Sequence, residues 1–303
     1  MATAKRKTRK KTRAGWLVAA IAALLLAALI GYMAANASVV RVRRARVAVP
    51  DLPPAFEGNT LLYVSDIDLC GWNTARKSAA LMMRLQELRP DILLLGGDYT
   101  SPSVIESLNR PLNRAPSLDA KRARMDFFLF IKDFYAPLGK FAVAAPEDGD
   151  LDDLRGAAES GGVRLLHGDA AKLESDGGAI WLKGCADGER GAGSAFQRGD
   201  CVIAAAWSPD AFPLMLTSEA KDGGPWIDLL LSGHTHGGQI SVLGRSILSL
   251  STQERQFPGG WSLQNGVPVL VGSGVGCEGA NLRLGSAPEV WLITLTAKSA
   301  EAE

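Results

Sequence analysis

Apolar residues along the chain form two kinds of pattern: short continuous runs, and runs with helical spacing. The continuous runs are bounded by Gly, Asp or Pro, which is typical of buried strands. We predict strands at NTLLYVSD (59–66), DILLLGGD (91–98), KFAVAA (140–145), VRLL (163–166), AIWLKGC (179–185), CVIAAAW (201–207), WIDLLLSG (226–233), VPVLVGSG (267–274) and EVWLITL (289–295). Helical spacing occurs at 76–90, where Leu81, Leu85 and Leu88 recur before Pro90, and at 119–137. This alternation predicts one α/β domain.

The amino-terminal segment has a different pattern. Residues 14–35 form an apolar stretch without a charged side chain, and the first thirteen residues carry seven Lys or Arg and no acid. The apolar stretch is long enough to cross a bilayer as a helix. We therefore predict a basic cytoplasmic tail (1–13), a transmembrane signal-anchor helix (14–35), a linker with the first strand (36–49), the main domain (50–298) and a short tail (299–303).

The charges flanking the apolar stretch predict its orientation. The basic cluster before it is larger than the one after it, which contains Arg41, Arg43, Arg44 and Arg46. Cytoplasmic flanks carry the excess of positive charge, so we expect a single-pass protein of the cell membrane with its domain on the periplasmic side. A cleaved signal peptide is the alternative, because Ala35-Asn36-Ala37 fits a small-x-small cleavage pattern.

Charge and cysteine content narrow the class of protein further. Beyond its basic tail the chain is mildly acidic, which argues against nucleic acid as a partner. The spacing of the four cysteines (Cys70, Cys185, Cys201 and Cys277) matches no metal motif. Disulfides are permitted in the predicted compartment, and the sequence leaves their pairing open.

Acidic and imidazole side chains follow several of the predicted strands. One strand ends in Asp66-Ile67-Asp68, the next in Asp98, a third in PEDGD (146–150), and a later one in the turn that holds His234 and His236. The carboxyl ends of neighbouring strands in an α/β sheet converge on one ligand-binding crevice. We therefore predict a metal site there. The remaining histidine, His167, is interpreted as structural.

Four segments together resemble a known family. They are PDLPPAFEGNTLLYVSDIDL, RPDILLLGGDYTS, LLLSGHTHGGQI and LVGSGVGCEGANLRLGSAPEVWLITL. They are similar to the calcineurin-like metallophosphoesterases, in particular the membrane-anchored bacterial branch, over nearly all of residues 50–297. The resemblance implies a four-layer α/β/β/α sandwich of two mixed sheets flanked by helices, here preceded by one transmembrane helix. It also implies a two-metal centre that hydrolyses phosphate esters, with Asp66, Asp98, His234 and His236 as ligands.

The chain departs from the family pattern at four positions. Asp68 stands where the family has a histidine, Pro146 and Glu147 replace an asparagine and a histidine, and Trp207 replaces another histidine. One ion then keeps Asp66, Asp98 and His236, with Asp68 as a further candidate, whereas the other retains only Asp98 and His234. We expect one divalent ion rather than two, and an oxygen-rich site favours Mn²⁺ or Mg²⁺.

Two functions follow from these departures. In the first, the protein is a phosphoric ester hydrolase with a rewired, carboxylate-rich site, in which Glu147 and His234 act catalytically and Glu147 protonates the leaving oxygen. In the second, the protein is a pseudoenzyme that binds without cleaving, and Trp207 fills the place of the second metal. The clustering of acids favours hydrolysis.

The expected partner is a phosphorylated small molecule or a lipid at the membrane face. Lipid-linked phosphodiesters and pyrophosphates, such as acylated sugar nucleotides, fit a membrane-anchored enzyme. We predict that Trp207 stacks on a base or sugar, and that Arg283 contacts a phosphate. GVGCEG (274–279) matches a dinucleotide-binding pattern, but no helical spacing follows it, so we predict a loop close to the site. FPGGWSL (257–263) is the candidate lid.

Overall fold

The computed structural model describes residues 2–101, 120–186, 188–242, 245–246 and 259–297. The helices are α1 (Ala2–Ala37), α2 (Ala75–Leu85), α4 (Ala120–Phe130), α5 (Leu151–Ser160) and α6 (Phe212–Thr217). The strands are β1 (Arg41–Val49), β2 (Thr60–Val64), β3 (Ile92–Leu95), β4 (Gly139–Val143), β5 (Arg164–Leu166), β6 (Ala170–Ser175), β7 (Gly178–Gly184), β8 (Cys201–Ala206), β9 (Leu229–Ser232), β10 (Ser241–Val242), β11 (Arg245–Ser246), β12 (Gly260–Gln264), β13 (Val267–Val271) and β14 (Glu289–Ala297).

Two six-stranded sheets form the centre of the domain. The first has the order β1-β14-β2-β3-β4-β5, and the second has the order β12-β13-β9-β8-β7-β6. Both are mixed: β14 is parallel to β1 but antiparallel to β2, while β7, β8, β9 and β13 are parallel between antiparallel edge strands. A separate β10–β11 pair lies outside both sheets.

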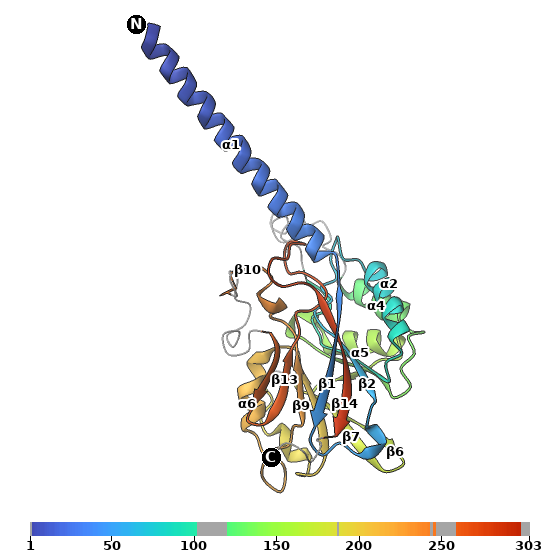
Figure 1. The fold of residues 1–303 in the computed structure, drawn as a ribbon. Helices are drawn as coiled ribbons and strands as arrows, with labels where there is room; N and C mark the ends of the chain where they lie inside the picture. The colour runs from blue at the N-terminus through green and yellow to red at the C-terminus, as the bar shows by residue number, and fades with distance from the viewer. Residues whose placement is uncertain (1, 102–119, 187, 243–244, 247–258, 298–303) are drawn as a thin grey trace.

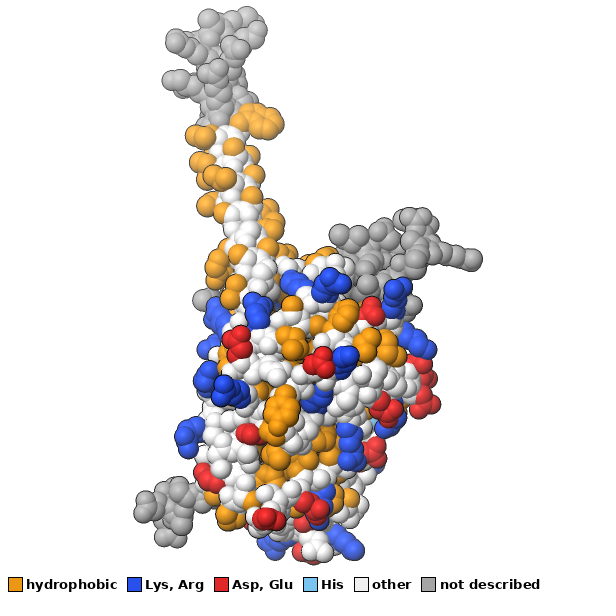
Figure 2. Space-filling model, turned by 90° about the vertical axis from the view of Figure 1, so that its right-hand side faces the viewer, with side chains coloured by type: hydrophobic (Ala, Val, Ile, Leu, Met, Phe, Trp, Pro, Cys, Tyr) orange, Lys and Arg blue, Asp and Glu red, His pale blue; other side chains and the backbone are white. Residues whose placement is uncertain are grey.

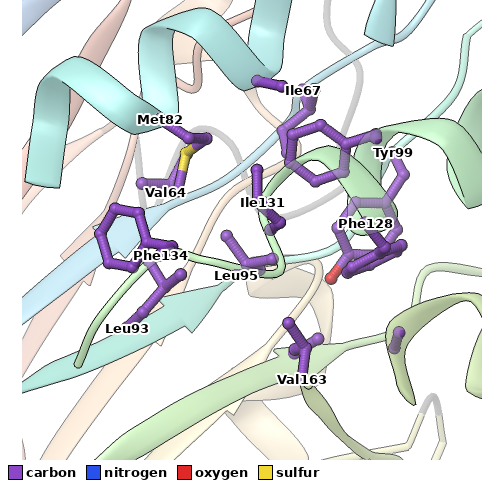
Figure 3. Close-up of a cluster of buried hydrophobic side chains, with 14 of the residues drawn as sticks. Val64, Ile67, Met82, Leu93, Leu95, Tyr99, Phe128, Ile131, Phe134 and Val163 are labelled. Atoms are coloured by element: carbon purple, nitrogen blue, oxygen red, sulfur yellow. The ribbon is translucent and has the colours of Figure 1, made fainter. Parts of the chain in front are cut away.

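Helices cover the outer face of each sheet, and one apolar cluster lies between the sheets. Leu61, Tyr63 and Ile293 of the first sheet pack with Ile203 and Leu231 of the second. The outer face of the first sheet packs under α2, α4 and α5 through the cluster drawn in Figure 3. The outer face of the second sheet packs under α6 through a third cluster. The predicted four-layer α/β/β/α sandwich is confirmed.

The predicted helices are present with shorter bounds. α2 begins after Thr74, whose hydroxyl accepts a hydrogen bond from the backbone N–H of Lys77, a capping arrangement that stabilises the first turn. It continues as a 3₁₀ turn, Gln86–Leu88, that ends at Arg89 in a left-handed conformation directly before Pro90. The second helix is α4; residue 119 lies outside the described residues.

The carboxyl ends of the central strands lie at the end of the domain where α1 joins it. β1 starts four residues after α1 and runs parallel to β14, whereas β2 runs antiparallel to β14. β2 therefore ends close to where β1 begins, and β3 and β4 run parallel to β2. Figure 1 shows α1 projecting from this end. Residues that follow β2 and β3 thus face the side from which the helix enters.

The outer part of α1 has the length and composition of a membrane span. Gly15–Ala37 is an apolar helical segment of 23 residues, and almost none of it is buried against the domain. Apolar side chains cover this helix, while Lys and Arg side chains gather on the domain just below it (Figure 2). β1 lies within the predicted linker segment 36–49.

Candidate metal centre

Three of the predicted ligands converge at the carboxyl ends of their strands. Asp66 follows β2, Asp98 follows β3 and His236 lies in the turn after β9, and one ligand atom of each lies within 4.8 Å of the others. All three are buried. Backbone hydrogen bonds hold the two strand ends together, from Asp66 N–H to Gly97 O and from Asp68 N–H to Asp98 O, both 3.1 Å. The arrangement fits one divalent ion with two carboxylates and one imidazole.

All five predicted ligands have a left-handed backbone conformation. The φ angles are +51° for Asp66, +50° for Asp68, +58° for Asp98, +69° for His234 and +52° for His236. Residues other than glycine adopt this region at a cost of roughly 1–2 kcal/mol, and such strain concentrates at functional sites. The backbone is therefore strained at each of the five predicted ligands, and three of their side chains converge.

Asp66 is buried beside another carboxylate. Its Oδ1 accepts the backbone N–H of His234 at 2.6 Å, and its Oδ2 accepts the Ser65 hydroxyl at 2.7 Å. Burial, and then the charge of Asp98, raise its pKa to about 7 despite these hydrogen bonds. A cation bound between the two carboxylates would remove that repulsion, which is the electrostatic reason to expect a metal here.

Asp68 lies beside the group of three rather than within it. It is buried, and its Oδ2 has no hydrogen-bond partner among the described residues, although His236 Nε2 is 3.5 Å away. Burial, and then the charges of Asp98 and Asp66, raise its pKa well above its usual range. Asp68 therefore offers an unused oxygen at the edge of the site, and its role as a ligand stays a prediction.

His236 is held by Arg283, a residue with 0% exposure. The guanidinium donates to the His236 carbonyl oxygen at 2.7 Å, lies 2.9 Å from His236 Nδ1 and donates to the Gly276 carbonyl oxygen at 2.6 Å. Because a guanidinium only donates, Nδ1 must accept, and the proton of the neutral ring is then on Nε2. Burial, and then the charge of Arg283, lower the pKa of His236 well below its usual value. In this tautomer neither ring nitrogen has a free lone pair, so coordination of an ion by Nε2 requires the proton to move to Nδ1 and the contact between Nδ1 and Arg283 to open.

Burial corrects the interpretation of Arg283 as a phosphate contact. The side chain is sealed from solvent, and its two terminal nitrogens bond His236 and Gly276, while its Nε has no hydrogen-bond partner among the described residues. Its charge lowers the pKa of Asp68, in opposition to the larger effects of burial and of Asp98. Arg283 therefore acts inside the protein as a counter-ion to the acidic cluster.

His234 and Trp207 lie together on the other side of Asp98. His234 Nδ1 is 3.6 Å from Asp98 Oδ2, and the rings of His234 and Trp207 are 4.2 Å apart at an interplanar angle of 58°. Trp207 is partly exposed, while its Nε1 is buried and has no hydrogen-bond partner among the described residues. The place expected for a second ion thus keeps two ligands and is bordered by an indole ring. The predicted stacking of Trp207 on a substrate is untested.

The PEDGD segment does not form the rebuilt acidic site that the sequence suggested. Glu147 is exposed, so the burial expected to make it a proton donor is missing. Asp148 is buried, and its carboxylate accepts the backbone N–H groups of Tyr99 (2.6 Å), Ala145 (2.9 Å) and Asp98 (3.1 Å). Asp150 caps α5 through the N–H of Asp153. Asp148 thus fixes the backbone at Asp98 through a hydrogen bond. The sequence did not indicate that Asp148 accepts these backbone hydrogen bonds.

Glu278 is a further carboxyl group near the site that the sequence did not single out. Its backbone N–H donates to Gln239 Oε1 and its carbonyl oxygen accepts from Gln239 Nε2, both at 2.9 Å. Partial burial, and then the charge of Asp98, raise the pKa of Glu278. The charges of His234 and Glu147 also affect this pKa, so Glu278 lies near the metal centre.

The glycines of GVGCEG bring a loop against the ligands, as predicted. A side chain at Gly274, whose φ is +68°, would meet Asp66 Oδ2 at 2.5 Å, and one at Gly276 would overlap the Cβ atom of Asp68. Only a residue without a side chain allows this approach. No helix follows the loop in the described residues up to Ala297. Residues 257–258 of the candidate lid lie outside the described residues, and 260–263 belong to β12.

All four cysteines lie in the described part of the chain, and none of them is in a disulfide. Each is buried. Burial raises the pKa of Cys185 to about 12, so this thiol is unreactive at neutral pH.

Three known proteins are similar to this chain over most of its length. The chain is 26% identical over 289 residues to an uncharacterized metallophosphoesterase of Aquifex aeolicus (strain VF5), a match that covers 91% of this chain and 99% of that protein. It is 28% identical over 295 residues to a Danio rerio protein named transmembrane protein with metallophosphoesterase domain, covering 91% of this chain and 62% of that protein. It is 24% identical over 263 residues to the uncharacterized metallophosphoesterase YkoQ of Bacillus subtilis (strain 168), covering 84% of this chain and 90% of that protein.

No family model matches the chain. The three relatives nevertheless share the metallophosphoesterase name, and the chain brings Asp66, Asp98 and His236 together as the motifs require. The resemblance is therefore confirmed: along nearly its whole length, the chain is similar to metallophosphoesterases of the calcineurin-like family.

Proposed function

We propose that this protein is a membrane-anchored, metal-dependent phosphoesterase that hydrolyses a phosphodiester or pyrophosphate bond. The convergence of Asp66, Asp98 and His236 within 4.8 Å carries the proposal, because these three donors can hold one divalent ion. Mn²⁺ or Mg²⁺ suits the two carboxylates. When bound, such an ion would polarise a phosphoryl oxygen and favour ionisation of a water molecule.

Residues near the metal centre, other than its three ligands, supply substrate binding and proton transfer. The His234 imidazole lies beside Asp98 and can donate a hydrogen bond to a phosphoryl oxygen. Protonation of the leaving oxygen needs an acid near the ion, and Glu278 is a candidate because burial and then the charge of Asp98 raise its pKa. Glu147, whose charge also raises the pKa of Glu278, stays the alternative proton donor.

The substrate that we propose is a phosphorylated molecule at the membrane face, such as a lipid-linked phosphodiester or pyrophosphate. The support is topological: β2 and β3 end where α1 enters the domain, so the metal centre lies at the end of the domain from which α1 projects. The excess of Lys and Arg before the span favours a cytoplasmic tail and a periplasmic domain of a cell-membrane protein.

A second function is a binding protein without catalysis. The contact between the Trp207 and His234 rings, 4.2 Å between centroids, favours it, because an indole borders the place of the second ion. Such a protein would still bind a phosphate group through one ion and His234.

Hydrolysis of an activated phosphodiester by the full chain in detergent tests the proposal. We expect turnover that requires Mn²⁺ and is lost in Asp98→Asn, which removes a ligand charge at constant size. Asp152→Asn, an exposed change on the first turn of α5, is the matched control and should retain wild-type turnover. Turnover that survives Asp98→Asn, or none in the wild type, contradicts hydrolysis at this site.

A further inference from the structure

The last turn of α1 packs against the loop that carries Arg283. Met33 and Ala37 are each 7% exposed, whereas Leu25, two turns earlier, is 65% exposed. The backbone N–H of Arg283 donates to the Met33 carbonyl oxygen, and the Asn36 side-chain amide donates to the Arg283 carbonyl oxygen, both at 3.2 Å. Both backbone polar groups of Arg283 are thus bonded to one turn of the anchor helix.

The side chain of the same arginine reaches the metal centre. It donates to the carbonyl oxygens of His236 and Gly276 and contacts His236 Nδ1. Gly276 in turn lies so close to Asp68 that a side chain at position 276 would overlap it. Arg283 therefore connects α1 to His236 through direct contacts and to Asp68 through Gly276.

The position of Asn36 distinguishes the two alternatives for the amino-terminal segment, a retained signal-anchor helix and a cleaved signal peptide. Asn36 is the middle residue of the small-x-small pattern at 35–37, so peptidase cleavage after Ala37 would remove both Met33 and Asn36. It is also the one side-chain amide in the segment 14–37, which a bilayer span disfavours unless the amide is bonded. Its bond to Arg283 gives this residue a role that an ordinary span would not need.

We propose that the last turn of α1 is a structural part of the metal centre, with Asn36 and Arg283 as positioning residues that hold the His236 turn. The inference rests on the metal-dependent function proposed above. A contact that links two sites couples them in both directions, so loosening the helix turn should loosen residues 234–239 and weaken metal binding at Asp66, Asp98 and His236.

Amide hydrogen exchange in the metal-free full chain tests the coupling first. Asn36→Ala removes the amide donor and retains a strong helix former, so α1 should stay helical. Ser38→Ala is the matched control, because its hydroxyl bonds only the Ala34 carbonyl oxygen at the end of the same helix. We expect faster exchange at residues 234–239 and 276–284 in Asn36→Ala and unchanged exchange in Ser38→Ala. Equal exchange in the two variants overturns the inference, whether or not the protein binds metal.

Mn²⁺ affinity provides the second measurement. Loss of one hydrogen bond should weaken Mn²⁺ binding about three- to tenfold in Asn36→Ala and leave it unchanged in Ser38→Ala. In the wild type, Mn²⁺ should slow exchange of the Arg283 amide, a readout that needs no variant. Faster exchange in Asn36→Ala without any Mn²⁺ binding would support the coupling while contradicting the proposed function. Mn²⁺ binding with equal affinity in both variants would contradict the coupling alone.

Discussion

Arg283 lies 2.9 Å from Nδ1 of His236 and is fully buried, so the imidazole is oriented by an internal cation rather than by a carboxylate or a backbone carbonyl. Metal-bound histidines in proteins commonly donate their second N–H to such acceptors. A guanidinium cannot accept, so without a bound ion the proton lies on Nε2, and coordination of an ion by Nε2 requires that proton to move to Nδ1 and the contact with Arg283 to open.

Replacing this arginine should destabilise the whole domain. Arg283→Met leaves the carbonyl oxygens of His236 and Gly276 without their donors and Asp68 without its nearest cation. Because a buried charged partner is lost, we expect the free energy of unfolding to fall by about 3–5 kcal/mol. Urea denaturation measures this, with Arg76→Met on the exposed face of α2 as the control. A loss below about 1 kcal/mol would show that the arginine network is not stabilising.

The pH dependence of stability should reveal the buried carboxyl groups. The pKa values of Asp66 and Asp148 are raised from 3.8 to about 7, chiefly by burial and then by Asp98. Between these values the folded chain retains protons that the unfolded chain has lost, so stability decreases as pH rises through that window. We expect the melting temperature in chelator to fall from pH 5 to pH 8.

Mn²⁺ should reduce that fall, because a bound cation stabilises the ionised form of Asp66. Asp148 binds backbone groups rather than the ion, so the part of its pKa shift that comes from burial should remain. A melting temperature that rises with pH in chelator, or one that Mn²⁺ leaves unchanged at pH 8, would contradict the electrostatic description of the site.

Asp148 should be required for full stability and for Mn²⁺ binding, although it is not expected to touch the substrate. Asp148→Asn replaces one carboxylate oxygen with an amide that cannot accept the backbone N–H groups of Tyr99 and Asp98 together. We expect the free energy of unfolding to fall by about 1–3 kcal/mol. Mn²⁺ binding should also weaken, because the backbone N–H of Asp98 loses its hydrogen-bond acceptor.

Asp150→Asn is the matched control for this change. Asp150 caps α5, and asparagine caps helices as well as aspartate does, so stability and Mn²⁺ affinity should stay close to wild type. Equal effects of the two substitutions in thermal melts would refute the special role of Asp148.

Local patterns in the sequence predicted an α/β domain and the three converging residues, whereas the four layers were implied by the resemblance to the family. Apolar runs bounded by Gly and Asp define β2, β3 and β9. The parallel pair β2–β3 places Asp66 beside Asp98, and the turn after β9 of the second sheet brings His236 to them. The environment of these residues depends on contacts across the chain, which periodicity does not encode. The bond from Asn36 to Arg283 joins residues 247 positions apart, and Asp148 accepts the backbone N–H of Asp98, 50 positions earlier.

Replacing three residues with those of the family distinguishes a catalytic site from an inactive one. Pro146→Asn, Glu147→His and Trp207→His together supply the missing ligands for a second ion. A chain already active with one ion should lose turnover, because its opening is reorganised and its metal preference changes. We expect that loss in a phosphodiester assay with Mn²⁺; activity that appears only in the triple variant would instead identify the natural chain as a binding protein.

Equilibrium titration of the full chain with Mn²⁺ tests the metal centre most directly, with free ion counted by electron paramagnetic resonance. We predict one tightly bound ion per chain, held by Asp66, Asp98 and His236, and its loss in Asp98→Asn but not in Asp152→Asn. Absence of bound Mn²⁺ in the wild type, or binding that Asp98→Asn leaves intact, would contradict the existence of this metal centre.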